Sequence, residues 1–162
     1  MEKKEKKTNM ILKINSLQEK TVIKMRCGVS QKGVQIRLLN RGMCSLVPGI
    51  KCQSENISVT SILDRFLEHG RVYIFGNGGD EKMYIGSADW MTRNLSHRIE
   101  VVTPVLDLDN FKIIRDVINI QLNDNVKARI IDAKQKNEYV KNDQMEVHSQ
   151  YMTYDYFKNL KQ

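Results

Sequence analysis

The sequence lacks the features that mark several common classes of protein. Its 162 residues include only two prolines and a single tryptophan. No apolar run reaches 18 residues and no signal-peptide pattern is present, so nothing in the sequence predicts membrane insertion or secretion. We therefore expect a cytoplasmic location, with peripheral association with a membrane left open.

Familiar site motifs are also missing. The sequence contains neither the G-x-x-x-x-G-K-[ST] phosphate loop nor the G-x-G-x-x-G dinucleotide fingerprint, which excludes the ordinary nucleotide-binding folds. Its three cysteines, Cys27, Cys44 and Cys52, lack the spacing of metal ligands, and we expect free thiols and no metal site. Aromatic residues do not alternate with basic ones along a strand, so no nucleic-acid platform is predicted.

What the sequence does have is an excess of positive charge. It contains 26 lysines and arginines against 19 acidic residues, a formal net charge of +7. Such a balance favours a polyanionic partner, which could be a nucleotide, a nucleic acid, an inorganic phosphate chain or an acidic lipid. Charge alone does not choose among these.

The pattern of apolar residues predicts one α/β domain over residues 9–162, preceded by a charged leader over residues 1–8. We expect a mixed, largely parallel sheet flanked by helices. Predicted strands cover residues 10–14, 34–39, 57–60, 72–75, 83–85, 98–103 and 126–131. Predicted helices cover residues 15–31, 61–69, 109–122 and 145–160.

The segment from Ser61 to Trp90 organises the predicted domain. Apolar residues at 62, 63, 66 and 67 have helical spacing, and an S-x-x-D start signal precedes them. His69 would then stand at the end of a short helix, two residues before Arg71, which begins a strand. The proton of His69 can move near neutral pH and Arg71 is always charged, so the pair suits an anionic ligand. The alternative is that His69 is an ordinary surface histidine, whereas Trp90 is expected to be a packing residue.

Arg41 is a second candidate for binding an anion. It directly follows the strand over residues 34–39, which completes a strand-helix-strand unit. Such units bind ligands beyond the carboxyl ends of their strands. The long loop over residues 40–56 contains Arg41, and long loops in compact domains are often functional. The remaining histidines, His97 and His148, sit alone among polar residues and are not expected to be catalytic.

Four strings resemble the C-terminal domain of polyphosphate kinase: RGMCSLVPGI, SENISVTSILDRFLEHGRVYIFGNGGD, YIGSADWMTRNLSHRIEV and DNVKARIID. The resemblance covers about residues 9–160 and implies a phospholipase-D-like fold. It also implies reversible transfer of the terminal phosphate of ATP to an inorganic polyphosphate chain. The family's catalytic and ATP- or phosphate-binding residues correspond here to His69 and Arg41, with Arg71 and Arg93 as weaker candidates.

The sequence departs from the phospholipase D signature. Arg71 stands where the signature has lysine, Gly76 stands where it has aspartate, and the string Gly86–Asp89 matches its last element only in part. Because the aspartate that would orient His69 is absent, we expect phosphate binding without phosphodiesterase chemistry.

The resemblance also concerns what this chain would lack. The family's enzyme is several times longer, and its phosphorylated histidine and magnesium-associated arginines lie in a preceding domain. This implies a fragment that is inactive alone and that works with the remaining N-terminal domains, Mg²⁺, ATP or ADP and polyphosphate, in a homo-oligomer and without nucleic acid. The alternatives are a non-catalytic polyanion-binding module and a structural or oligomerisation module.

Overall fold

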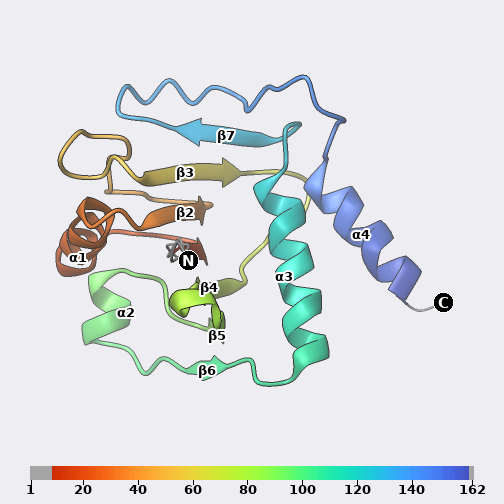
Figure 1. The fold of residues 1–162 in the computed structure, drawn as a ribbon, viewed down its shortest axis with the longest axis horizontal. Coiled ribbons are helices and arrows are strands. Elements are labelled where there is room, and N and C mark those ends of the chain that lie inside the picture. Colours follow the sequence, from red (N-terminus) through yellow and green to blue (C-terminus); the bar gives the residue numbers. More distant parts are fainter. Residues whose placement is uncertain (1–8, 161–162) are drawn as a thin grey trace, which may run out of the picture.

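The computed structural model describes residues 9–160, which form one seven-stranded sheet with helices on both faces (Figure 1). The charged leader predicted for residues 1–8 lies outside the described residues. The strands are β1 (Asn9–Ile14), β2 (Gln35–Asn40), β3 (Ile57–Ile62), β4 (Arg71–Phe75), β5 (Lys82–Gly86), β6 (Val102–Pro104) and β7 (Ala128–Ile131). The helices are α1 (Lys20–Gln31), the 3-10 turn η1 (Asn77–Gly79), α2 (Thr92–Ser96), α3 (Leu108–Leu122) and α4 (Ser149–Leu160).

The strand order is β6-β5-β4-β1-β2-β3-β7. Only the neighbours β1–β2 and β2–β3 are parallel, whereas β1–β4, β4–β5, β5–β6 and β3–β7 are antiparallel. The mixed sheet is thus confirmed, but the expectation that it is largely parallel is wrong. A single strand-helix-strand crossover supplies the first parallel pair, and the short β4–β5 hairpin supplies one of the antiparallel pairs.

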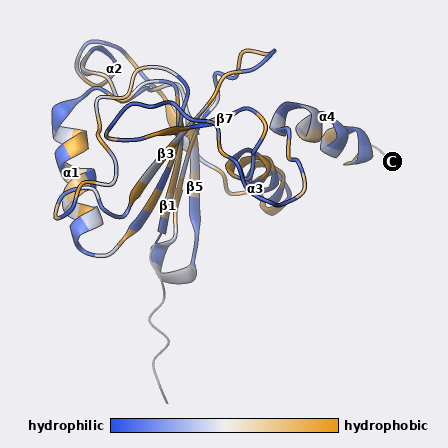
Figure 2. Cartoon of the chain, turned by 90° about the horizontal axis from the view of Figure 1, so that it is seen from above, coloured by the Kyte–Doolittle hydropathy of each residue, from blue (hydrophilic) through white to orange (hydrophobic). Residues whose placement is uncertain are grey.

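Alternate residues of the central strand β1 serve two cores. Leu12 and Ile14 pack against the α1 side, together with Leu38 of β2. Ile11 packs on the other side with Ile118 of α3. Figure 2 shows α1 and α3 on opposite faces of the sheet, with α4 outside α3. Burial on both faces fixes the register of β1, because a slip of one residue would move each side chain of the strand to the opposite face of the sheet.

The helix predicted from residue 15 begins at Lys20. Glu19 caps it, since its carboxylate accepts a hydrogen bond from the backbone N–H of Val22 at 2.8 Å. Residues 15–18 instead form an extended segment whose backbone pairs with loops, as in the bond from Gln18 N to Trp90 O at 2.8 Å. Gly33 ends the helix region with φ of +84°, a conformation that favours glycine after a helix.

The helix predicted over residues 61–69 is wrong. Strand β3 continues to Ile62, which pairs with Ala128 of β7, and residues 63–70 form a loop. Leu63, Phe66 and Leu67 are 59%, 61% and 72% exposed, so their helical spacing does not form a buried stripe. As part of β3, residues 61 and 62 pair through backbone hydrogen bonds with β7, and these bonds would be lost if the residues formed a helix.

Other predicted elements exist but have different ends. The strand expected at 98–103 is β6, of only three residues, because the segment before it is held by a side chain: Glu100 accepts from Asn94 Nδ2 at 2.6 Å. The last helix begins at Ser149 and not at Met145. Among residues 9–160, no helix is both long enough and apolar enough to cross a membrane.

Candidate functional site

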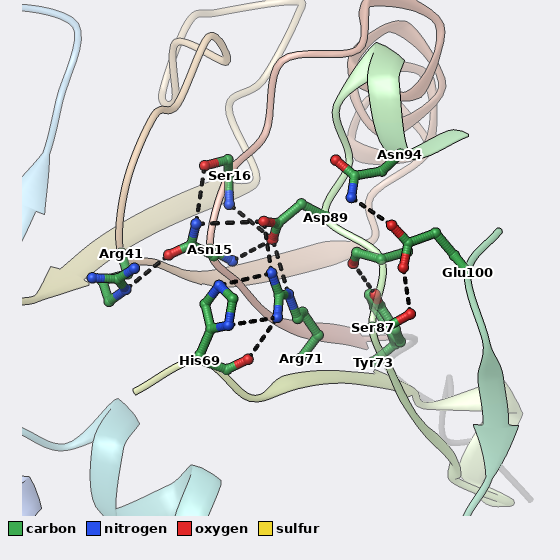
Figure 3. A network of polar contacts seen from close by, with 11 residues as sticks. Asn15, Ser16, Arg41, His69, Arg71, Tyr73, Ser87, Asp89, Asn94 and Glu100 are labelled. Carbon is green, nitrogen blue, oxygen red and sulfur yellow. Dashed lines mark hydrogen bonds and ion pairs between the residues drawn. The ribbon is translucent and has the colours of Figure 1, made fainter. Parts of the chain in front are cut away.

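The candidate site lies at the edge of the sheet that is formed by strand ends, where β1 and β2 reach their carboxyl ends. Strand β4 runs antiparallel to β1, with Val72 opposite Lys13, so its first residue lies at this same edge. Strand β5 ends there too, because Gly86 pairs with Arg71. Four segments that are distant in sequence therefore supply the side chains shown in Figure 3. The central residues are Asn15, Ser16, Arg41, His69, Arg71 and Asp89.

A buried ion pair anchors the site. Arg71 Nη2 lies 2.9 Å from Asp89 Oδ2, and Arg71 Nε donates to Asp89 Oδ1 at 3.2 Å. Their side chains are only 10% and 4% exposed. Asp89 also accepts from the backbone N–H groups of Asn15 and Ser16, at 2.8 and 3.1 Å. Burial acts to raise the pKa of Asp89, but the hydrogen bonds from Arg71, Ser16 and Asn15 outweigh it and lower the pKa.

His69 stands against the same arginine. Arg71 Nη1 lies 3.2 Å from His69 Nδ1, and Arg71 Nη2 lies 3.0 Å from His69 Nε2, while Nη1 also donates to the His69 carbonyl oxygen at 2.8 Å. Only one nitrogen of a neutral imidazole can accept, so at most one of the two ring contacts is a hydrogen bond. The predicted proximity of His69 and Arg71 is confirmed. An exposed imidazole held beside a guanidinium favours the binding of an anion.

Arg41 follows β2 at the same edge and is half-buried. Its Nε donates to Asn15 Oδ1 at 2.8 Å, which fixes the direction of the guanidinium. Among residues 9–160, no hydrogen bond is formed by its two Nη groups. Arg41 therefore offers two fixed donors to a ligand, on the edge where His69 also lies (Figure 3).

The loop that carries Asp89 is held by a separate set of contacts. Tyr73 donates its hydroxyl to Ala88 O at 2.6 Å, and its ring stacks on Trp90 with centroids 5.7 Å apart. Burial raises the pKa of Tyr73 to about 12, so the phenol keeps the proton it donates. Ser87 donates its hydroxyl to Glu100. Trp90 is a packing residue, as predicted.

Not every candidate residue belongs to the site. Arg93 is exposed on α2, outside the group of contacts around Asp89. His97 is exposed at the end of α2. His148, expected to sit alone, instead contacts the carboxylate of Asp64. Asp89 could not be predicted as the anchor of Arg71, because 18 residues and a whole hairpin separate the two.

The expectation that an aspartate at position 76 would orient His69 is wrong. The Gly76 N–H donates to Asn9 O at 2.8 Å, which places Gly76 beside the first residue of β1, at the opposite edge of the sheet from His69. A Cβ at Gly76 would also lie 3.1 Å from both N and O of Asn9. An aspartate there could not orient His69, and its absence removes nothing from the site. Arg71 holds the histidine instead.

No cluster suited to a metal ion occurs in the part of the chain that the structure describes. Within residues 9–160 there is no group of three His, Cys, Asp or Glu side chains that could hold one. The carboxylate nearest the site, Asp89, is already engaged by Arg71 and two backbone N–H groups. The described residues therefore do not by themselves fit magnesium. The three cysteines are free thiols, as predicted.

Comparison with solved structures defines the class of fold. The phospholipase D family member Nuc from Salmonella typhimurium superposes with a TM-score of 0.58 at 12% identity, covering 78% of this chain and 84% of that one. At this identity the likeness concerns the fold alone. The chain therefore has a phospholipase-D-like α/β fold.

Residues 1–150 match the family model of polyphosphate kinase C-terminal domain 2, and the chain belongs to this family. The polyphosphate kinase of Vibrio parahaemolyticus is 49% identical over 156 residues, which are 96% of this chain and 22% of that protein. The crystal structure of the Porphyromonas gingivalis polyphosphate kinase superposes with a TM-score of 0.92 at 46% identity, over 95% of this chain and 24% of that one. The chain thus spans less than a quarter of the length of these relatives.

Proposed function

We propose that this chain is the C-terminal catalytic-core domain of a polyphosphate kinase, which transfers the terminal phosphate of ATP reversibly to an inorganic polyphosphate chain. The observation that carries the proposal is the fixed guanidinium of Arg41, whose Nη groups have no partner within residues 9–160, at the same edge as the His69–Arg71 pair. The nearby carboxylates of Asp89 and Glu68 are paired with Arg71 and Lys13, so the charge of Arg41 is left for a ligand.

Each residue has a role that its chemistry supports. Phosphoryl transfer spreads negative charge over phosphate oxygens, and the protein mainly positions and stabilises that charge. Arg41 clamps these oxygens with its two free donors. His69 donates a proton or hydrogen bond to the transferring phosphate and is not the nucleophile. Arg71 holds His69 and contributes positive charge, as a weaker direct contact.

The remaining parts of the reaction come from outside this chain. The proposed substrates are ATP or ADP and polyphosphate, and the family resemblance assigns the phosphorylated histidine and the magnesium-associated arginines to a preceding domain. Magnesium, when bound, would neutralise phosphate charge. A cytoplasmic location and a homo-oligomeric complete enzyme are further proposals that rest on the same resemblance.

Calorimetric titration of the chain with inorganic tripolyphosphate tests the binding role. Arg41→Ala should weaken binding by about tenfold or more, since it removes a charge-assisted bidentate contact. Lys32→Ala is the charge-matched control, because Lys32 is exposed at the end of α1, near the opposite edge of the sheet. Equal losses in both variants would mean diffuse attraction, and no loss in Arg41→Ala would favour a purely structural module.

A further inference from the structure

The loop over residues 63–70 carries His69 but receives little support from the hydrophobic core. It leaves the end of β3 and passes the ends of β2 and β1 before it enters β4. Its apolar side chains at 63, 66 and 67 are largely exposed. The position of His69 must therefore be fixed by polar contacts, since burial of these side chains does not fix it.

Gln150, in the first turn of α4, makes three of these contacts. Its Oε1 accepts from the backbone N–H of Phe66 at 2.9 Å, and its Nε2 donates to the Phe66 carbonyl oxygen at 2.8 Å. One amide side chain thus satisfies both backbone groups of one loop residue, as a neighbouring strand would. Only asparagine and glutamine carry a donor and an acceptor in this arrangement.

The same amide reaches Glu68, the residue before His69. Gln150 Nε2 lies 3.0 Å from Glu68 Oε1. The other oxygen of Glu68 forms an ion pair with Lys13 of β1 at 2.8 Å and accepts from Gln121 of α3. Lys13 in turn donates to Gln121 Oε1 at 2.9 Å. Glu68 is therefore held by the sheet, by α3 and by α4 together.

We propose that Gln150 is a positioning residue for the phosphate site, acting through Phe66 and Glu68 to hold His69 against Arg71. This inference rests on the proposed function, because it assigns Gln150 a part in binding phosphate. It also gives α4 a role. Ser149 is the only residue of this helix that is buried, so the helix adds little to the core, yet its first turn fixes the loop that carries the candidate acid.

The test uses the complete 162-residue chain with three measurements on each variant: the His69 Cε1–H resonance by NMR, tripolyphosphate affinity by calorimetry, and the melting temperature. Gln150→Met keeps the size and helix propensity of the side chain but removes its hydrogen bonds. It should shift or broaden the His69 resonance and weaken tripolyphosphate binding by about threefold to tenfold, the effect of losing one or two net hydrogen bonds. Gln150→Ala should do the same.

The matched control is Asn159→Ala, which removes an exposed amide from the same helix. It should leave the His69 resonance and the affinity unchanged. If Gln150→Met keeps both the wild-type resonance and the wild-type affinity, Gln150 is not a positioning residue, whatever happens to the melting temperature. If wild type itself fails to bind tripolyphosphate, the proposed function fails, whereas the His69 resonance still decides whether Gln150 fixes the loop.

Discussion

Arg71 contacts two side chains at once, Asp89 through a buried fork and His69 through both ring nitrogens. Arg71→Lys would keep the charge but could not reproduce the fork, so Asp89 would lose part of its compensation. We expect a loss of about 1.5–3 kcal/mol in the free energy of unfolding, the value of a charged hydrogen bond. Urea denaturation measures it, with Arg98→Lys at an exposed position as the control. An unchanged midpoint in Arg71→Lys would contradict this account of the ion pair.

The lowered pKa of Asp89 makes a prediction about acid. A carboxyl whose pKa is lower in the folded than in the unfolded state contributes stability above its unfolded pKa of about 3.9, and loses this contribution as pH falls through the folded pKa. Asp89→Asn removes that titration. The free energy of unfolding of wild type should therefore fall more steeply below about pH 4 than that of the variant. Parallel curves in urea denaturation at pH 5, 4 and 3 would show that Asp89 does not titrate as proposed.

His69→Gln tests the proposed acid in a complete polyphosphate kinase that contains this domain. Glutamine can still form a hydrogen bond, but it cannot donate a proton from a charged ring. Turnover should fall by roughly 10²-fold to 10⁴-fold, whereas nucleotide affinity should change much less. Steady-state ATP consumption with polyphosphate product, measured alongside nucleotide binding, checks this. Turnover close to wild type would leave a non-catalytic polyanion-binding module as the better description.

Asp124 connects the end of α3 to two later elements, β7 and α4. One carboxylate oxygen accepts from the backbone N–H groups of Val126, Lys127 and Ala128, at 3.0, 2.6 and 2.9 Å. The other accepts from Ser149 N at 2.9 Å, at the start of α4. Asp124→Ala should cost about 3 kcal/mol in the free energy of unfolding, since buried donors lose a charged acceptor.

The loss in Asp124→Ala should reach the site as well, because Ser149 precedes Gln150. We expect the His69 resonance of this variant to shift or broaden, as we expect for Gln150→Met. Asp143→Ala, at an exposed position in the loop before α4, is the control and should change neither stability nor resonance. If Asp124→Ala lowers the free energy of unfolding but leaves the His69 resonance unchanged, anchoring of α4 by Asp124 does not position the loop over residues 63–70.

The sequence predicted most strands and helices because their signals are local. Short apolar runs mark β4 and β5, the Asn77–Asp80 turn residues mark their hairpin, and His69 and Arg71 are close in any chain because one residue separates them. The segment over residues 61–69 failed for the opposite reason. Its conformation depends on β7 and on Gln150, which lies 84 residues from Phe66, and periodicity within the segment contains no information about either.

For the molecule as a whole, we predict that the purified chain binds tripolyphosphate but does not make polyphosphate from ATP. The donors that we propose to bind phosphate lie within residues 9–160, whereas the resemblance assigns the covalent nucleophile to another domain. Incubation with ATP and magnesium, followed by electrophoresis of the products, measures this. Polyphosphate synthesis by the chain alone would contradict the prediction. A preparation of the complete enzyme serves as the positive control.

The anchor of the site, Asp89, depended on the arrangement of the whole sheet and could not be predicted. Gly76 shows the same limit: its place in a sequence motif suggested a role beside His69, but the length of β4 carries it to the other edge. A motif gives the order of residues along the chain. It does not show at which end of the sheet each residue lies.

The placement of β4 beside β1 also has a consequence for folding. The hydrogen bond from Asn15 N to Asp89 joins residues 74 positions apart, so the site exists only in a chain whose sheet has assembled. Contacts of such long range form slowly. A phosphate chain that binds there recognises the folded state and not the unfolded one, and at 100 times its dissociation constant it would add about 2.7 kcal/mol to stability by mass action. In a cell rich in polyphosphate, a phosphate chain bound as we propose would thus protect the domain from proteolysis.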